Sequence, residues 1–472
     1  MSKVTELLPH LLSPDAASYE PLFPVRPEDT PTVLHTYLPK GVFPFFLPDV
    51  DLVVDLERSV TPTIVDARSG KEYIDLFTCF ASMPLGFNHP KLLEPGFLRT
   101  LLIAALNKPS NSDILTTVYA TFVKTLFTLA APPAFRYAFF IEGGALAVEN
   151  ALKVAFDWKV RQNFRKGYAY ERGHQVIHFR CAFHGRSGYT LSLTNTEPNK
   201  TMYFPKFPWP RIHNPALRFP VTDQVLEQVI REEQQAIEQI KQAFHEYRDD
   251  IAAIIIEPIQ GEGGDNHFRA EFLQALRQIA DENEALLIFD EVQTGVGLTG
   301  TMWVHEQLGV TPDILVFGKK MQVCGLLVTE RVDTEPENVF HVPGRINSTW
   351  GGNLVDMLRA TRYLEIIHQE RLLDHVRRVG SYLQHRLHEL QAEFPELISN
   401  VRGRGLFCAF DLPNDTVRQL FRRYVFQKGV LLLPCGERSI RFRPPLTISE
   451  GIIDEALERI RSVLASLRRE IS

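Results

Sequence analysis

The hydrophobic positions between about residues 85 and 345 fall into two alternating kinds of segment. Short, continuous apolar runs predict strands that are buried on both faces, as in a mostly parallel sheet. The runs occupy residues 137–141, 176–179, 251–256, 286–289 and 314–317. Between the runs, apolar residues recur at helical spacing, for example from Val148 to Phe156 and from Phe272 to Ala280. This alternation predicts a large α/β domain with helices on both faces of the sheet.

The pattern changes after Gly352. A long helical region runs to about residue 395, short strands follow near 405–410 and 439–442, and a last helix carries one apolar face. This combination predicts a second, smaller α+β domain at residues 351–472.

The N-terminal part has its own pattern. Residues 1–50 are rich in proline and aromatic residues, and we expect them to form an extended arm. Short strands are expected near 52–56 and 63–66. The N-terminal unit, residues 1–75, would then join the small domain, and residues 76–350 would form the large one.

Composition and charge exclude several classes of protein. The 472 residues are 44% hydrophobic and 23% charged, and the net charge of −6 favours neither nucleic acid nor an anionic membrane as a partner. No apolar run approaches the roughly 20 residues of a spanning helix, and the N-terminus has no apolar core long enough for a secretory signal, so neither is expected. The five cysteines are scattered without a CxxC pair, so no metal is expected and the cytoplasm is the expected compartment.

Two residues at predicted strand ends carry the most informative chemistry. Asp290 follows the run at 286–289, and Lys319 follows the run at 314–317. A lysine can form a Schiff base with an aldehyde and a carboxylate can keep a pyridine nitrogen protonated, so the pair indicates a pyridoxal 5'-phosphate (PLP) enzyme. The pattern does not separate Lys319 from the adjacent Lys320. It also leaves Asp290 open to being a helix cap or a metal ligand.

Other strand ends and loops suit a cofactor or an anionic substrate. Residues 142–147 join a strand to a helix, whose N-terminus favours a phosphate. Phe183 could stack on a flat ring, and Arg186 could bind a carboxylate through two hydrogen bonds. Arg441 and Arg443 share one face of a short strand, where they either meet a carboxylate or form surface ion pairs.

Two polar loops are further candidates. Residues 257–265 follow the run of six apolar residues at 251–256, and their glycines allow a tight loop beside a site. Residues 347–353 combine hydroxyl groups with glycines, which suits a phosphate as well as a domain linker. Each segment alone has an ordinary structural explanation, and the weight lies in their joint occurrence.

Taken together, these segments resemble the class III (subgroup II) aminotransferases, which are PLP enzymes. The resemblance covers nearly the whole chain from about residue 40. The segments that carry the resemblance are residues 143–153, 182–195, 204–211, 317–325 and 347–353. It implies the PLP-dependent transferase fold type I, with a large domain whose mostly parallel sheet lies between helices, and a smaller α+β domain.

The resemblance implies a role for each matching residue around the cofactor. Lys319 would hold PLP through a Schiff base, and Asp290 would pair with its pyridine nitrogen. Gln293 would lie near the 3-hydroxyl, and Phe183 would stack on the ring. Lys319 and Asp290 are therefore the expected catalytic residues.

The phosphate would be bound by two chains. Gly144 and Ala145 would donate backbone N–H groups to it, and Thr349 would reach the phosphate of the partner subunit. The resemblance therefore implies a homodimer with active sites at the subunit interface.

Four residues would bind substrates. Arg186 would hold the substrate carboxylate far from the reacting amine, and Asn347 would also contact substrate. Arg441 would receive the α-carboxylate of L-glutamate and 2-oxoglutarate. Glu262 would neutralise Arg441 while the bound substrate has no carboxylate beside its reacting carbon. It would swing away from Arg441 when a dicarboxylate binds.

The longer strings are most similar to family members that act on L-lysine. They imply a ping-pong transfer of the ε-amino group of L-lysine to 2-oxoglutarate. The products would be L-glutamate and 2-aminoadipate 6-semialdehyde, which cyclises to a piperideine-6-carboxylate. The alternatives are another ω-aminotransferase, acting on ornithine or 4-aminobutyrate, a PLP-dependent aminomutase, and a non-catalytic PLP-binding protein.

Overall fold

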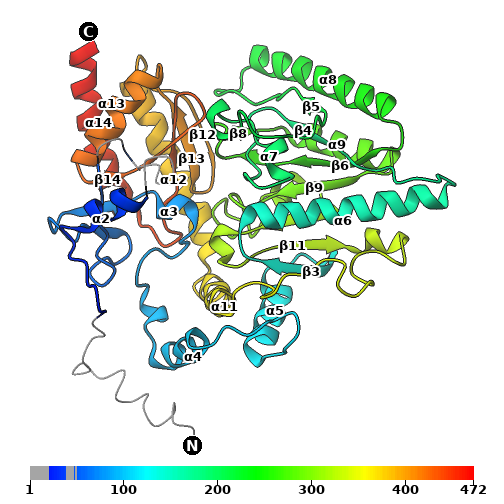
Figure 1. Ribbon diagram of the computed structural model, residues 1–472. Helices are drawn as coiled ribbons and strands as arrows, with labels where there is room; N and C mark the ends of the chain where they lie inside the picture. The colour runs from blue at the N-terminus through cyan, green and yellow to red at the C-terminus, as the bar shows by residue number, and fades with distance from the viewer. Residues whose placement is uncertain (1–20, 39–46, 48–49, 472) are drawn as a thin grey trace, which may run out of the picture.

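The computed structural model describes residues 21–38, 47 and 50–471, and a large twisted sheet forms its centre (Figure 1). Within the described residues this sheet has seven strands. Their order is β3 (Phe135–Ile141), β11 (Cys324–Thr329), β10 (Ile314–Phe317), β9 (Leu286–Asp290), β6 (Ile251–Ile256), β4 (Gln175–Phe179) and β5 (Arg211–Ile212). The pairs from β10 to β5 are parallel, whereas β11 is antiparallel to both neighbours. The predicted α/β fold with a mostly parallel sheet is confirmed.

Helices cover both faces of this sheet (Figure 1). One face packs against α6 (Gly144–Arg165), and the other packs against α5 (Thr117–Leu129), α8 (Asp223–Glu246) and α9 (Ala270–Glu282). In β6, Ala253 and Ile255 belong to the apolar cluster under α6, while Ile254 and Ile256 belong to the opposite cluster. Successive strand residues point to opposite faces, so an unbroken apolar run is required here.

The C-terminal region contains two long helices where one helical region was expected. They are α11 (Leu354–Gln369) and α12 (Leu372–Glu393). Arg371 separates them with a φ of +52°, a left-handed conformation that ends the first helix. A second sheet follows, in the order β12 (Ser399–Arg404), β13 (Phe407–Asp411), β16 (Ser439–Phe442) and β15 (Leu433–Cys435). Helices α13 (Asp415–Gln427) and α14 (Glu450–Ile471) complete this region.

A small sheet joins the N-terminal strands to the C-terminal region. Its order is β1 (Thr63–Val65), β2 (Glu72–Asp75) and β14 (Val430–Leu431), with β14 parallel to β2. The expected strand at 52–56 was wrong, because this segment forms only an isolated bridge between Val54 and Asp66. The domain boundaries stay a prediction.

Residues 1–50 were expected to form an extended arm. This expectation is wrong for the segment that forms the helix α2 (Thr30–Tyr37). Pro31 lies in the first turn of that helix, where a missing N–H costs nothing. The expectation for residues 1–20, 39–46 and 48–49 lies outside the described residues. The remaining short α-helices and strands are α3 (Thr78–Ala81), α4 (Pro95–Ala105), α7 (Thr190–Leu193), α10 (His305–Leu308), β7 (Ile259–Gln260) and β8 (Asn266–His267). Short 3₁₀ helices are η1 (Pro90–Leu92), η2 (Pro198–Lys200), η3 (Lys319–Met321) and η4 (Glu330–Thr334).

Candidate active site

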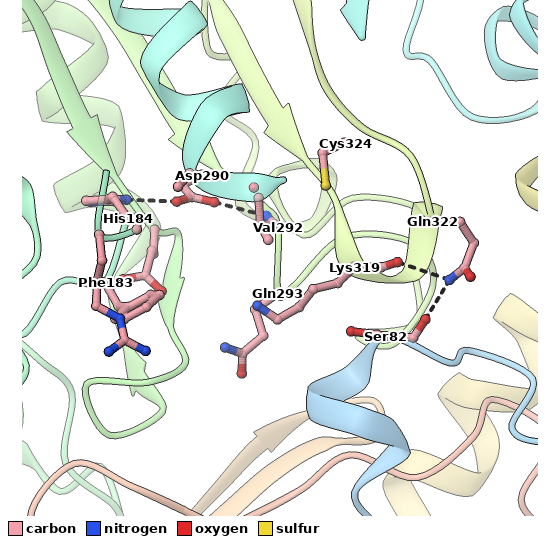
Figure 2. A pocket seen from close by; sticks show the side chains of 14 residues that line it. Ser82, Phe183, His184, Asp290, Val292, Gln293, Lys319, Gln322 and Cys324 are labelled. Atoms are coloured by element: carbon pink, nitrogen blue, oxygen red, sulfur yellow. Dashed lines mark hydrogen bonds and ion pairs between the residues drawn. The ribbon is translucent and has the colours of Figure 1, made fainter. Parts of the chain in front are cut away.

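A cavity of about 510 Å³ lies at the carboxyl ends of the central parallel strands (Figure 2). It brings together seven of the residues that were predicted for the site. These are Gly144, Ala145, Phe183, Arg186, Asp290, Gln293 and Lys319. The parallel strands all end at one edge of the sheet, so side chains from distant segments meet there.

Asp290 is the last residue of β9 and its carboxylate is buried. Its Oδ2 lies 2.8 Å from Nδ1 of His184, and its Oδ1 accepts a hydrogen bond of 3.1 Å from the Val292 N–H (Figure 2). Burial acts to lower the pKa of His184, but the hydrogen bond and charge of Asp290 outweigh burial and raise that pKa. His184 therefore holds the Asp290 carboxylate in place at the end of β9, facing the cavity.

Glu257 is a second buried carboxyl group in the cavity lining, and its role was not predicted. It accepts hydrogen bonds from the N–H groups of Phe183 (2.9 Å) and Gly261 (3.2 Å). Burial raises its pKa to about 7, with the Asp290 charge acting in the same direction and His184 against it. Glu257 thus fixes the backbone that carries the predicted stacking ring. The sequence signal for Glu257 was the polar loop at 257–265, which follows the apolar run at 251–256.

The structure distinguishes the two adjacent lysines. Lys319 lines the cavity, and its backbone has a φ of +47° directly after β10. Lys320 is buried, and its Nζ donates a hydrogen bond of 2.6 Å to the carbonyl oxygen of Gln293. Burial lowers the pKa of the Lys319 amine, although the charge of Asp290 acts in the opposite direction. A lysine with a lowered pKa is a better nucleophile and base at neutral pH. Burial lowers the pKa of Lys320 as well, so the place of Lys319 in the cavity lining distinguishes the two.

Gln322 and Ser82 also line the cavity, and neither was predicted. The side-chain amide of Gln322 donates to the carbonyl oxygens of Ser82 (2.6 Å) and Lys319 (3.1 Å), as Figure 2 shows. Gln322 itself has a φ of +68°. These bonds fix the turn that presents Lys319. The bond to Ser82 joins segments 240 residues apart, so no local pattern in the sequence indicates it.

The first turn of α6 provides an anion site at the cavity. Gly144 and Ala145 line the cavity, and the N-cap residue Gly143 has no side chain to occupy the free N–H groups. Gly143 has a φ of +103°, which favours glycine at this position. The N-terminus of a 22-residue helix carries a partial positive charge that suits a phosphate.

These groups fit PLP. The cavity combines an amine, a buried carboxylate and a helix N-terminus, which match the aldehyde, pyridine nitrogen and phosphate of that cofactor. The ring of Phe183 lies in the same lining.

Arg441 and Glu262 form an ion pair beside the cavity, in which Arg441 is buried and Glu262 is partly exposed. Arg441 lies on β16 and is 3% exposed, and its guanidinium is 2.9 Å from Oε2 of Glu262. It also donates a hydrogen bond of 3.1 Å to Oε1 of Gln293, which lines the cavity. Lys200 contacts the other oxygen of Glu262 at 2.6 Å. Burial acts to raise the pKa of Glu262, but Arg441 and Lys200 outweigh burial and hold this pKa at about 2.

The neighbouring Arg443 has a structural partner. Its guanidinium forms two hydrogen bonds with the carboxylate of Asp265, at 3.0 and 2.6 Å, and both residues are buried. It also lies 3.4 Å from the centre of the Phe407 ring. The surface ion pair considered for this strand is therefore excluded for Arg443, which is engaged in the protein interior.

Three predicted binding residues are exposed. Arg186 lies in the cavity lining with its side chain open to solvent. Asn347 and Thr349 are exposed and do not belong to the cavity lining of this chain. The structure thus does not bring these two residues to the site.

Comparison with known proteins identifies the family. A model of the family described as aminotransferase class-III matches residues 48–464. The chain belongs to the class III aminotransferases. Enzymes of this class depend on PLP, so the protein is a PLP-dependent aminotransferase of fold type I.

Similar proteins are named for one substrate. The chain is 51% identical to the L-lysine-epsilon aminotransferase of Mycobacterium tuberculosis H37Rv, over 92% of this chain and 96% of that one. It is 50% identical to the protein of the same name from Streptomyces clavuligerus, over 89% and 92%. A solved structure of the M. tuberculosis lysine aminotransferase, in its internal aldimine form, matches with a TM-score of 0.90 and 50% identity, over 94% and 100%.

Two further features are absent from the described residues. No helix there is long and apolar enough to cross a membrane. The same part of the chain contains no group of three or more His, Cys, Asp or Glu side chains arranged to hold a metal ion.

Proposed function

We propose that this protein is an L-lysine 6-aminotransferase, which transfers the ε-amino group of L-lysine to 2-oxoglutarate. One observation carries the proposal: a buried arginine beside the cavity, Arg441, is neutralised by a carboxylate, Glu262, at 2.9 Å. Such a pair suits an enzyme whose two substrates differ at the reacting carbon. One substrate has no carboxylate on that carbon, and the other has an α-carboxylate there. The names of the similar proteins support the same substrate.

Class III aminotransferases use PLP, whose aldehyde takes up the amino group and whose ring accepts electrons. Lys319 would hold the cofactor at Nζ and Asp290 would pair with the pyridine nitrogen, supported by His184 at 2.8 Å. The N–H groups of Gly144 and Ala145 would bind the phosphate. Phe183 would stack on the ring, and Gln293 would lie near the 3-hydroxyl.

In the lysine half-reaction, the exposed guanidinium of Arg186 would hold the α-carboxylate at the mouth of the cavity. The ε-amine then lies deeper, near Lys319. The Nζ of Lys319 would take a proton from Cε of the substrate as a general base, and as a general acid would deliver it to the carbon that was the cofactor's aldehyde. Water releases 2-aminoadipate 6-semialdehyde, which cyclises to a piperideine-6-carboxylate.

The ion pair explains how one pocket serves two unlike substrates. Bound L-lysine has no carboxylate at the reacting carbon, so a bare Arg441 would be an unpaired buried cation, which is costly. Glu262 neutralises it. L-Glutamate and 2-oxoglutarate carry a carboxylate at that carbon, and this group would replace Glu262 on Arg441.

The complete site would require a homodimer. Thr349 and Asn347 are exposed in the single chain and lie outside its cavity lining, as expected for residues that reach a partner's site. Exposed apolar side chains before, on and after α4, and Trp350 beside Thr349, provide a surface for such a partner. The apolar residues are Leu93, Ile103, Leu106, Ile114 and Leu115. We propose a cytoplasmic location for this dimer.

Competition between amino donors tests the substrate. Purified enzyme with PLP and 2-oxoglutarate is offered L-lysine, L-ornithine and 4-aminobutyrate, and the L-glutamate formed is measured. The proposal expects the highest kcat/KM with L-lysine and a cyclised product of matching mass. Preference for either other amine would keep the class and discard the substrate. Conversion of an amine without glutamate formation would indicate an aminomutase.

A further inference from the structure

Lys200 contacts the ion pair of Arg441 and Glu262, and no role has been assigned to it. We call this pair the gate, because it would be closed with L-lysine bound and open with a dicarboxylate bound. It ends the short turn η2 (Pro198–Lys200), and its side chain is only 13% exposed. Its Nζ lies 2.6 Å from Oε1 of Glu262, and it lies 5.6 Å from the centre of the Phe183 ring. Its other carboxylate contact, Glu197 at 3.1 Å, has a side chain that is 55% exposed.

The carboxylate of Glu262 is divided between two cations. Oε2 pairs with Arg441 at 2.9 Å, and Oε1 pairs with Lys200 at 2.6 Å. The side chain of Glu262 is 26% exposed, so water solvates its charge only in part. When a substrate carboxylate takes over Arg441, Glu262 must leave that cation without becoming an unpaired charge. Lys200 is the second cation already in contact with it.

We propose that Lys200 is a positioning residue that retains Glu262 when Glu262 releases Arg441. This inference rests on the proposed function of the pair. Lys200 stabilises the open arrangement, in which Arg441 is free for a carboxylate, because Lys200 is then the remaining partner of Glu262. In the closed arrangement Glu262 keeps Arg441 as a partner whether or not Lys200 is present. Loss of Lys200 therefore disfavours the open arrangement more than the closed one.

The test compares the two half-reactions in single-turnover measurements on the holoenzyme. Lys200→Met is expected to lower kcat/KM with L-glutamate about 10-fold, as for a partly buried charge pair, and to change the L-lysine half-reaction less than about 2-fold. Lys200→Arg should restore most of the glutamate half-reaction. Lys206→Met is the matched control, because Lys206 is exposed in the same segment and bonds the Thr201 carbonyl oxygen.

A double variant makes the test independent of a general structural defect. In a Glu262→Gln background, Lys200→Met should have little further effect on the glutamate half-reaction, because the charge that Lys200 retains is gone. Circular dichroism and thermal unfolding establish that each variant is folded. If Lys200→Met proves unfolded, Lys200→Gln replaces it in the same comparison.

Other outcomes overturn the proposal. Equal losses in both half-reactions would assign Lys200 a merely structural role, and no loss in either would remove the role altogether. A loss confined to L-lysine would mean that Lys200 binds the lysine carboxylate itself. If the unmodified enzyme reacts with L-glutamate but not with L-lysine, the proposed function fails, while the glutamate measurements on the Lys200 variants still decide the role of Lys200.

Discussion

Replacing Glu262 by glutamine tests the charge balance of the gate most sharply. The substitution keeps the shape and a carbonyl oxygen that accepts a hydrogen bond from Arg441, now 2.9 Å away, and removes only the negative charge. Two unit charges about 4 Å apart interact by about 4 kcal/mol at an effective dielectric constant of about 20. Since the neutral hydrogen bond recovers about half of this, the net loss is about 2 kcal/mol. That loss is felt most when L-lysine is bound, because the bound substrate excludes the water that would solvate an unpaired Arg441 in the empty site.

Glu262→Gln is therefore expected to lower kcat/KM for the L-lysine half-reaction about 30-fold, which is the equivalent of 2 kcal/mol. The L-glutamate half-reaction should be unchanged or faster, because the substrate carboxylate no longer competes with a charged side chain. Stopped-flow absorbance with each substrate alone measures both values. Glu197→Gln is the control, because Glu197 contacts Lys200 but is largely exposed. Equal losses with both substrates, or an unchanged lysine reaction, would refute the reasoning.

Three further predictions follow from the same geometry. Lys319→Ala should bind PLP without the absorbance of the lysine-bound cofactor and lose about 10³-fold or more in turnover, whereas Lys320→Ala should keep measurable turnover; the reverse result would exchange the two assignments. Asp265→Asn leaves the buried Arg443 without its counter-charge, and should destabilise the fold by about 3 kcal/mol, seen as a lower thermal midpoint; an unchanged midpoint would contradict the buried pair. Because the pKa of Glu262 is lowered from 4.5 to about 2, its stabilising pair is complete above about pH 4.5 and is lost only as pH falls toward 2. The ratio of the L-lysine and L-glutamate half-reaction rates should therefore not change with pH near neutrality on account of Glu262. A change of this ratio near neutral pH that disappears in Glu262→Gln would contradict the prediction.

The strands and their ends were predictable because burial on both faces leaves a strong signal. The six apolar residues of β6 are all buried, and each faces one of two helix layers. Asp290 was found because it directly follows such a run, and Lys319 because it lies two residues beyond one. The antiparallel strand β11 was not predicted, because its apolar residues directly follow the lysine motif. The strand expected at 52–56 has the apolar pattern but only one bridge to a neighbour.

The parts of the site that the sequence did not reveal depend on contacts between distant segments. Lys319 and Lys320 have the same chemistry, and only the backbone turn with a φ of +47° separates a cavity residue from a buried one. The contact between Lys200 and Glu262 joins residues 62 positions apart in different loops. Asn347 and Thr349 were named only through the resemblance, and both lie outside the cavity lining of this chain.

Contacts between distant segments also separate the roles of two neighbouring arginines, Arg441 on β16 and Arg443 directly after it. Arg441 and Arg443 are two positions apart, and alternation predicts one shared face. Their different roles come from different carboxylates, Glu262 and Asp265, which lie on one loop. A partly exposed partner leaves Arg441 available for exchange, whereas a fully buried partner fixes Arg443.

The most direct test of the proposed activity is a single half-reaction. The PLP form of the purified enzyme is mixed with L-lysine alone, the cofactor absorbance is followed, and the product is identified by mass. We predict conversion of the cofactor to its amino form, a cyclised product derived from 2-aminoadipate 6-semialdehyde, and full reversal of the absorbance by 2-oxoglutarate. No reaction with L-lysine, together with conversion by L-ornithine or 4-aminobutyrate, would contradict the proposed substrate.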